Sequence, residues 1–253
     1  MHNVKVISLT NSHGVCSGIE QQLRKIGLAF KNVSFLYSLG EIEETLYRDT
    51  EKKVAITSLA CEIKNSLFVT GDSGVGKTSF IRSLAPLIKR HLPNSTLIEI
   101  STASIISGCK YRGEFEDKLS KLLEVCAENS VIIYFDEAHT LSMTGGEETG
   151  GIDALNILKP YLSSGLRCIL SSTKVESRSL TKDKAFSRRF RTLCLEEMPK
   201  EFYAEIIYKK FSSQTTIDMS YMKSIIDENE YTNLYELIDL IDFKIAETKI
   251  ANQ

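Results

Sequence analysis

A glycine-rich segment, GDSGVGKTS at 71–79, has the residue types and spacing needed to bind the phosphates of a nucleotide. Gly71, Gly76, Lys77 and Thr78 fit the pattern GxxxxGK[ST], after a predicted strand and before a predicted helix. Backbone N–H groups of such a loop turn towards the phosphates, the lysine reaches the β- and γ-phosphates, and the threonine hydroxyl binds Mg²⁺. The loop residues expected to contact the nucleotide are Asp72, Ser73, Gly74, Val75, Gly76, Lys77, Thr78 and Ser79.

An acidic pair follows a run of apolar residues in VIIYFDEAH at 131–139. The run predicts a buried strand that brings Asp136 and Glu137 to its carboxyl end, where open α/β sheets bind ligands. Asp136 is suited to the Mg²⁺ shell beside Thr78, and Glu137 to polarising the attacking water. Together with Lys77, the pair predicts hydrolysis of a nucleoside triphosphate, with ATP and Mg²⁺ as cofactors. The letters DEAH at 136–139 also match a helicase motif, but such helicases need two ATPase domains and the sequence has one phosphate loop.

The segments around these motifs alternate between short apolar runs and stretches of helix length. Strands are expected at 66–71, 95–100, 130–137, 166–172 and 192–197, with helices at about 77–90, 113–127 and 151–164. This order predicts an α/β P-loop NTPase fold with a parallel five-stranded sheet.

From Pro199 onward the residues fit helices alone, so we expect a large nucleotide-binding domain over 41–198 and a small all-helical domain over 199–253. The apolar stripe expected on the last helix consists of Leu234, Leu237, Ile238, Ile241 and Ile245. The fold of residues 1–40 is unclear; the segments 4–9, 18–27 and 33–38 read as strand, helix and strand.

Composition and net charge indicate where the protein acts and which partners it binds. The 253 residues carry a formal net charge of −2, which gives no overall attraction to nucleic acid or to an anionic membrane. No apolar run approaches the roughly 18 residues of a membrane-spanning helix, and no signal-peptide pattern opens the sequence. The scattered cysteines read as free thiols in a reducing cytoplasm. We therefore expect a cytoplasmic protein with no membrane partner, and nucleic acid is not the partner that we favour.

Two further clusters have more than one interpretation from the residues alone. Three arginines precede the last expected strand: Arg188, Arg189 and Arg191. They are compatible with a solvated basic face, a phosphate-contacting patch or an arginine finger. Tyr111 lies between two cations, Lys110 and Arg112, in SGCKYRGEFE at 107–116.

The stretch from about 48 to 246 resembles the first ATPase domain of the Clp-type AAA+ unfoldases and disaggregases, closest to ClpA. The matching segments, in the family's order, are RDTEKKV, KNSLFVTGDSGVGKTS, SGCKYRGEFEDKL, IIYFDEAHT, GGIDALNILKPYLSSG, KDKAFSRRF and LIDLIDFKIAE.

The resemblance implies a hexameric, nucleotide-dependent ring that acts on protein substrates. It implies that Tyr111 faces an axial pore and grips an extended polypeptide, supported by Lys110 and Arg112. Thr173 matches the polar residue that senses the γ-phosphate, whereas Arg188 and Arg189 match arginine fingers acting on the neighbouring subunit's ATP. The segment 144–153 matches a second pore loop, and Leu46 is expected to contact the nucleotide beside the family's adenine-binding motif.

The sequence also departs from the family pattern. Tyr47 stands where the family has the glycine of a Gly-Arg-Asp motif near the adenine, Leu170 replaces a glycine, and Ser172 replaces a threonine. The helical-domain motif Pro-Asp-Lys-Ala is replaced by the residues at 234–237, LYEL. Nothing in these residues resembles the family's N-terminal domain or its second ATPase domain, so partnership with a ClpP-like peptidase is not expected.

Three functions fit these observations. The favoured one is an Mg-ATP-hydrolysing hexamer that remodels or unfolds proteins through Tyr111. The first alternative is a regulatory or scaffolding ATPase that assembles on ATP and recruits partners without threading them, and the second is a nucleic-acid-directed AAA+ loader.

Overall fold

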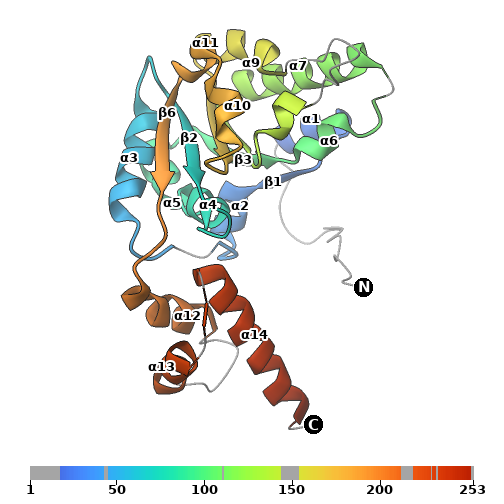
Figure 1. The fold of residues 1–253 in the computed structure, drawn as a ribbon. Helices are drawn as coiled ribbons and strands as arrows, with labels where there is room; N and C mark the ends of the chain where they lie inside the picture. Colours follow the sequence, from blue (N-terminus) through green and yellow to red (C-terminus); the bar gives the residue numbers. More distant parts are fainter. Residues whose placement is uncertain are drawn as a thin grey trace.

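The structure is a computed structural model that describes residues 18–42, 45–109, 111–143, 154–211, 219–228, 230–231 and 233–251. In these residues one six-stranded sheet has the order β1-β3-β4-β5-β2-β6 (Figure 1). The strands are β1 (Phe30–Asn32), β2 (Ser66–Gly71), β3 (Thr96–Ile100), β4 (Val131–Phe135), β5 (Arg167–Ser172) and β6 (Phe190–Leu195). Strands β2 to β6 pair in parallel, which confirms the predicted α/β fold class.

The sheet has one strand more than the five that the sequence predicted. The three-residue β1 pairs antiparallel with β3, where Phe30 faces Ile100. The segment 33–38, expected to be a strand, is instead helix α2 (Val33–Ser38). Its strand-forming side chains are overridden because the Asn32 side chain accepts a hydrogen bond from the Phe35 N–H (3.0 Å) and so caps a helix. The helix expected at 18–27 is α1 (Gly18–Lys25), whereas the strand expected at 4–9 lies outside the described residues.

Helices cover both faces of the sheet (Figure 1). One buried cluster joins Phe68, Ile133 and Leu170 to side chains of the helices α7 (Arg112–Glu128) and α9 (Ala154–Ser163). The other faces α3, α4 and α5. The remaining helices of this part are α3 (Asp49–Ala60), α4 (Lys77–Arg82), α5 (Ala85–His91), α6 (Thr102–Ile106), α8 (Thr140–Met143), α10 (Ser177–Thr181) and α11 (Lys184–Ser187).

The helix expected over 77–90 is divided into α4 and α5. Pro86 occupies the first turn of α5 and has no N–H, so it cannot donate to the carbonyl of Arg82, four residues earlier. The chain therefore turns after α4, which leaves α4 short and directly over the end of the sheet.

From Lys200 onward the described residues form helices and have a core of their own. They comprise the 3₁₀ turn η1 (Lys200–Phe202), α12 (Tyr203–Phe211), α13 (Met219–Glu228) and α14 (Leu234–Ala251). Leu237, Ile241 and Ile245 of the expected stripe are buried in a separate cluster, and Leu234 and Ile238 pack against it. Strands β2 and β6 point towards these helices (Figure 1).

An ion pair fixes α4 to the sheet beside the phosphate loop. The guanidinium of Arg82 donates to both carboxylate oxygens of Glu99 on β3, at 2.7 and 2.8 Å. The Glu99 side chain is only 12% exposed, and Lys31 approaches the same carboxylate at 3.5 Å from a more exposed position. A two-point, partly buried pair holds its geometry better than a single contact in solvent.

We predict that Arg82→Met lowers the free energy of unfolding by about 1–3 kcal/mol, because it leaves a partly buried carboxylate without its main donor. The matched control is Lys31→Met, which removes the exposed partner of the same carboxylate and should cost less than about 1 kcal/mol. Urea unfolding followed by circular dichroism compares the two. Equal losses would contradict a special role for the Arg82 contact.

Candidate nucleotide-binding site

The phosphate loop has a backbone conformation that favours glycine. Gly74 and Gly76 have φ angles of +81° and +89°, in the left-handed region that favours glycine. A Cβ atom added to Gly71 would lie 2.6 Å from the carbonyl oxygen of Leu195 on β6. The loop between β2 and α4 therefore has the tight turn and exposed N–H groups expected of a phosphate cradle.

Lys77 begins α4 and its side chain folds back over the loop. Its Nζ atom donates to the carbonyl oxygens of Gly71 (3.0 Å) and Asp72 (2.9 Å). Burial lowers the pKa of Lys77, and the carboxylates of Asp136 and Asp72 act against that shift. The Lys77 ammonium thus lies beside the carboxyl end of β4. Phosphate oxygens of a bound nucleotide could replace the two carbonyls as its acceptors.

Asp136 is held by several donors at the end of β4. Its Oδ2 atom accepts from the Thr78 hydroxyl at 2.7 Å, and its Oδ1 atom accepts from the Ser171 hydroxyl and from the Glu137 N–H. Burial alone would raise the pKa of Asp136, but these hydrogen bonds, together with one from the Tyr134 phenol, outweigh it and lower the pKa. The group is therefore a charged, oriented carboxylate.

These donors and acceptors fit Mg²⁺ bound together with a nucleotide. A hydroxyl and a carboxylate are hard oxygen ligands, and Mg²⁺ commonly combines one or two of them with water and substrate phosphates. In the described part of the chain, no group of three or more His, Cys, Asp or Glu side chains is placed to hold a metal ion by itself. Thr78 and Asp136 would therefore hold the ion only in company with phosphate oxygens.

Glu137 follows Asp136 in an unusual conformation. Its φ angle is +51°, and its side chain is exposed at the carboxyl edge of the sheet. Its carbonyl accepts from the Thr140 hydroxyl (2.9 Å), which fixes the turn. A non-glycine residue in the left-handed region is strained, and such strain gathers at functional sites.

Thr173 follows β5, next to the acidic pair in the sheet. Its hydroxyl donates to the Glu176 carboxylate at 2.6 Å, and that carboxylate lies 3.3 Å from Nδ1 of His139. The hydrogen bond from Thr173 is the largest influence lowering the pKa of Glu176. Sequence reasoning missed Glu176, although its spacing of three residues from Thr173 is that of a turn in which side chain and backbone bond each other.

Lys174, also missed, ties the loop to the sheet. Its Nζ atom lies 3.2 Å from Asp72 and 2.8 Å from Glu196 at the end of β6. Asp72, expected to contact the nucleotide, is therefore engaged by a lysine. No sequence motif marks this contact, because the three residues are far apart along the chain.

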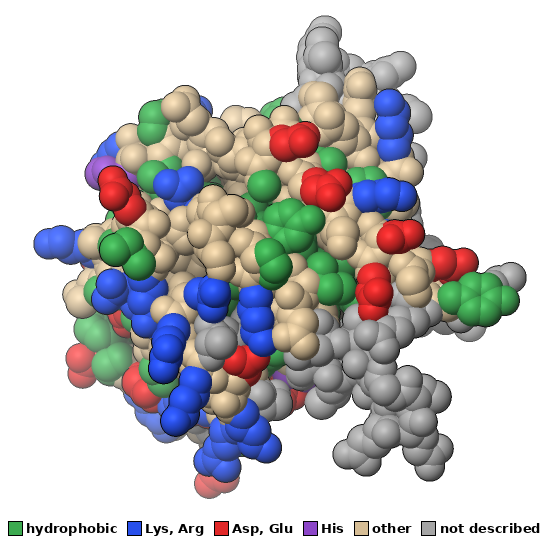
Figure 2. All heavy atoms as spheres, turned by 90° about the horizontal axis from the view of Figure 1, so that it is seen from above, with side chains coloured by type: hydrophobic (Ala, Val, Ile, Leu, Met, Phe, Trp, Pro, Cys, Tyr) green, Lys and Arg blue, Asp and Glu red, His purple; other side chains and the backbone are tan. Residues whose placement is uncertain are grey.

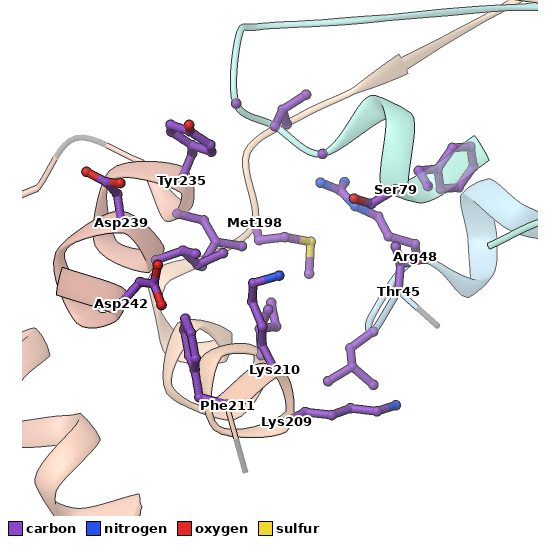
Figure 3. A pocket seen from close by; sticks show the side chains of 18 residues that line it. Thr45, Arg48, Ser79, Met198, Lys209, Lys210, Phe211, Tyr235, Asp239 and Asp242 are labelled. Atoms are coloured by element: carbon purple, nitrogen blue, oxygen red, sulfur yellow. The ribbon is translucent and has the colours of Figure 1, made fainter. Parts of the chain in front are cut away.

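A pocket of about 740 Å³ adjoins the phosphate loop on the side of the helical part. Figure 3 shows side chains from α12 and α14 reaching into it opposite Arg48 and Ser79. Five of the residues expected to contact the nucleotide line it, namely Leu46, Gly74, Val75, Gly76 and Ser79. Sequence reasoning missed the other side of the pocket, which includes Met198, Lys210, Tyr235 and Asp239; only the departure at 234–237 pointed to this segment.

Tyr47, the residue at the family's glycine position, joins the pocket mouth to the helical part. Its backbone keeps a left-handed φ of +56°. Its ring stacks on Phe202 of η1 with centroids 4.2 Å apart, and its hydroxyl donates to Glu205 of α12. The neighbouring Arg48 donates to the carbonyl of Glu196 at 2.7 Å. The departure at Tyr47 thus replaces a flexible residue with an inter-segment contact.

Arg188 and Arg189 lie at the amino ends of the parallel strands, whereas the phosphate loop lies at their carboxyl ends. They precede β6, whose first residue, Phe190, faces Ser66, while Leu195 faces Gly71 at the loop. At about 3.3 Å per residue, the arginines are a full strand, roughly 17 Å, from the loop of their own chain. Arg188 is exposed, and the guanidinium of Arg189 donates to the Ser163 hydroxyl (2.7 and 3.0 Å). Figure 2 looks onto the end where α9 and α11 lie and shows Lys and Arg side chains gathered there.

Tyr111 is 73% exposed and immediately precedes α7. Its N–H is 3.4 Å from the Glu114 carboxylate, so its backbone belongs to the helix start while its ring faces solvent. Arg112 is the first residue of α7; Lys110 and the second expected pore loop at 144–153 lie outside the described residues. Among the described residues, no helix combines the length and apolar character needed to cross a membrane.

Comparison with known proteins identifies relatives of this chain. The family described as "ATPase family associated with various cellular activities (AAA)" matches residues 67–191. The chaperone protein ClpB of Rickettsia conorii is 34% identical over 247 residues, covering 90% of this chain and 28% of that protein. A ClpA homologue of Guillardia theta is 35% identical over 210 residues, covering 80% of this chain and 25% of that protein.

A structure of Saccharomyces cerevisiae Hsp104 in complex with casein superposes with a TM-score of 0.79 at 26% identity, covering 92% of this chain and 42% of that one. The chain spans about a quarter of the length of the two curated relatives. Because ClpB and ClpA relatives match to a similar degree, the comparisons support the Clp type without singling out ClpA. The chain belongs to the AAA+ ATPases and, within them, is a relative of the Clp-type chaperones, as its motifs predicted.

Proposed function

We propose that this chain hydrolyses Mg-ATP with residues at the carboxyl ends of its parallel strands. Lys77 binds the β- and γ-phosphates, Thr78 and Asp136 hold the ion, and Glu137 orients and polarises the attacking water. The ion, when bound, neutralises charge on the phosphates. Thr173 turns from Glu176 towards the γ-phosphate, because a hydroxyl that donates to a carboxylate can equally donate to a phosphate oxygen.

The observation that best supports an assembly is the distance between the arginines and the loop. Arg188 and Arg189 are about a strand length from the phosphate loop of their own chain, so they can reach a nucleotide only in another copy. A head-to-tail contact in which each copy offers its arginines to the next gives a ring when the rotation between copies closes. We propose a nucleotide-dependent hexamer, in which residues 41–198 act as the large unit and 199–253 as the small helical unit.

We also propose that the ring remodels protein substrates through Tyr111. Three features support this: the tyrosine is exposed, it opens a long helix anchored in the core, and it lies in a segment that matches a pore loop of the family. An aromatic ring packs on many kinds of side chain, so it suits a substrate site that is not sequence-specific. A cytoplasmic location is part of this proposal, since the described cysteines are free thiols.

We predict that Glu137→Gln binds ATP, hydrolyses it at least about 100-fold more slowly, as expected when a general base is lost, and forms hexamers with Mg-ATP. Light scattering with and without ATP measures the assembly.

In the wild type, activity per milligram should rise with protein concentration. In the Arg188→Ala and Arg189→Ala variants, ATP binding should persist while hydrolysis falls.

The matched control is Arg191→Ala, in the same cluster but on β6 itself, which should hydrolyse ATP at the wild-type rate. Activity that is independent of concentration in a monomer would contradict arginines acting between copies. It would leave the phosphate loop and acidic pair as a self-sufficient site.

We predict that Tyr111→Ala weakens binding of fluorescein-labelled casein about five- to ten-fold, because the packing of one aromatic ring is lost, a cost of roughly 1 kcal/mol. ATP hydrolysis without casein should stay at the wild-type rate. Fluorescence anisotropy in the presence of ATP, in the Glu137→Gln background, measures the binding.

Tyr111→Phe keeps the ring and should bind casein like the wild type, and Phe243→Ala removes another exposed aromatic, on α14, as a matched control. If Tyr111→Ala binds and remodels casein normally, the scaffolding alternative is favoured, in which the assembled ATPase recruits partners without threading them.

A further inference from the structure

A phenol hydroxyl is buried in the most apolar strand of the sheet. Tyr134 lies on β4 in the run Val131–Phe135 and its side chain is fully buried. It packs in the cluster that contains Val69, Ile169 and Leu195. A phenylalanine would fill the same space without burying a polar group, which costs free energy unless the group is hydrogen-bonded. The position of the hydroxyl therefore needs an explanation.

The hydroxyl points at the Mg²⁺ site through a serine. The Tyr134 hydroxyl is 3.2 Å from Oγ of Ser171 on β5, and the Ser171 hydroxyl donates to Oδ1 of Asp136. Strand register explains the alignment: Tyr134 faces Ile169, and both Asp136 and Ser171 lie two residues further along, on the same face of the sheet.

The direction of this chain of hydrogen bonds follows from counting hydrogens. A serine hydroxyl has one hydrogen, and that of Ser171 is used in the bond to the Asp136 carboxylate. In the contact between Tyr134 and Ser171, the tyrosine must therefore be the donor. The hydrogen bonds therefore run from the Tyr134 phenol to Ser171 and from Ser171 to Oδ1 of Asp136. The Oδ2 atom of Asp136 accepts from Thr78.

We propose that Tyr134 is a positioning residue for the carboxylate that holds Mg²⁺, acting through Ser171; this rests on the ATPase proposed above. The phenol keeps the Ser171 hydroxyl turned towards Asp136, so Oδ1 stays fixed and Oδ2 stays next to Thr78. Without it, the Ser171 hydroxyl loses the donor that orients it, and the carboxylate loses one of its fixed donors. Partners outside the first ligand shell commonly change metal affinity in this way.

The test is Tyr134→Phe, which removes only the hydroxyl. Binding of a fluorescent ATP analogue is titrated with MgCl₂, and the Mg²⁺ concentration at half-maximal enhancement of affinity is compared with that of the wild type. We expect it to rise about three- to ten-fold, less than the loss typical of a partner that contacts the ligand directly. Binding of the analogue in EDTA should not change, because the phosphate loop is intact.

Two further variants separate positioning from general stability. Ser171→Ala should raise the Mg²⁺ requirement as well. Adding Tyr134→Phe to it should raise the requirement by less than Tyr134→Phe does alone, since the phenol acts mainly through the serine. Tyr203→Phe is the matched control: this tyrosine is also buried and its hydroxyl donates to Glu197 at 2.8 Å, but it lies in the helical part. It should leave the Mg²⁺ requirement at the wild-type value.

The outcomes distinguish the inference from the function beneath it. A wild-type protein whose affinity for the ATP analogue does not depend on Mg²⁺ would overturn the proposed ATPase, and this inference with it. A wild type that needs Mg²⁺ beside a Tyr134→Phe variant with the same requirement would overturn the positioning role alone. Additive effects of the two substitutions would also overturn the positioning role. A Ser171→Ala variant with an unchanged Mg²⁺ requirement would do the same, and this test can be made even if Tyr134→Phe does not fold.

Discussion

The hydrogen bond from Thr78 to Asp136 is the contact on which the rest of the site depends. It joins the first turn of α4 to the end of β4, across the neighbouring strand β5. Because the loop ends where α4 begins, fixing this helix also fixes the N–H groups offered to a phosphate chain. Arg82, one helical turn further on, makes the second attachment through Glu99 on β3. Two side chains on one face of a short helix thus align the loop, the acidic pair and the sheet.

The functional groups are divided between the carboxyl ends and the amino ends of the strands because the strands are parallel. All five parallel strands end at the edge that holds the loop, Asp136, Glu137 and Thr173, as expected for open α/β sheets. The residues that precede β6 must then lie at the other edge, and these are the arginines. One chain cannot bring both sets together without breaking the sheet, so this topology favours a site completed by another copy.

The helical part adds a wall that the sheet cannot provide. Its cluster around Leu237 and Ile241 is separate from the two clusters of the sheet, so it can keep its own packing if the pocket opens or closes. The stack of Tyr47 on Phe202 and the bond to Glu205 are direct links across that boundary. They occur at the position where the sequence was expected to depart from a family glycine.

The sequence by itself determined the order of the five parallel strands, the phosphate loop and the acidic pair, because these depend on local patterns: glycine spacing, apolar runs and their ends. It could not predict that 33–38 is helical, since a single cap at Asn32 decides this against strand-forming side chains. It also missed Ser171, Lys174 and Glu176. These residues matter through partners on other strands and loops, as Ser171 does through Asp136 and Lys174 through Asp72 and Glu196. Only the tertiary structure decides such contacts, because strand register and loop closure bring together groups whose separation along the chain carries no signal.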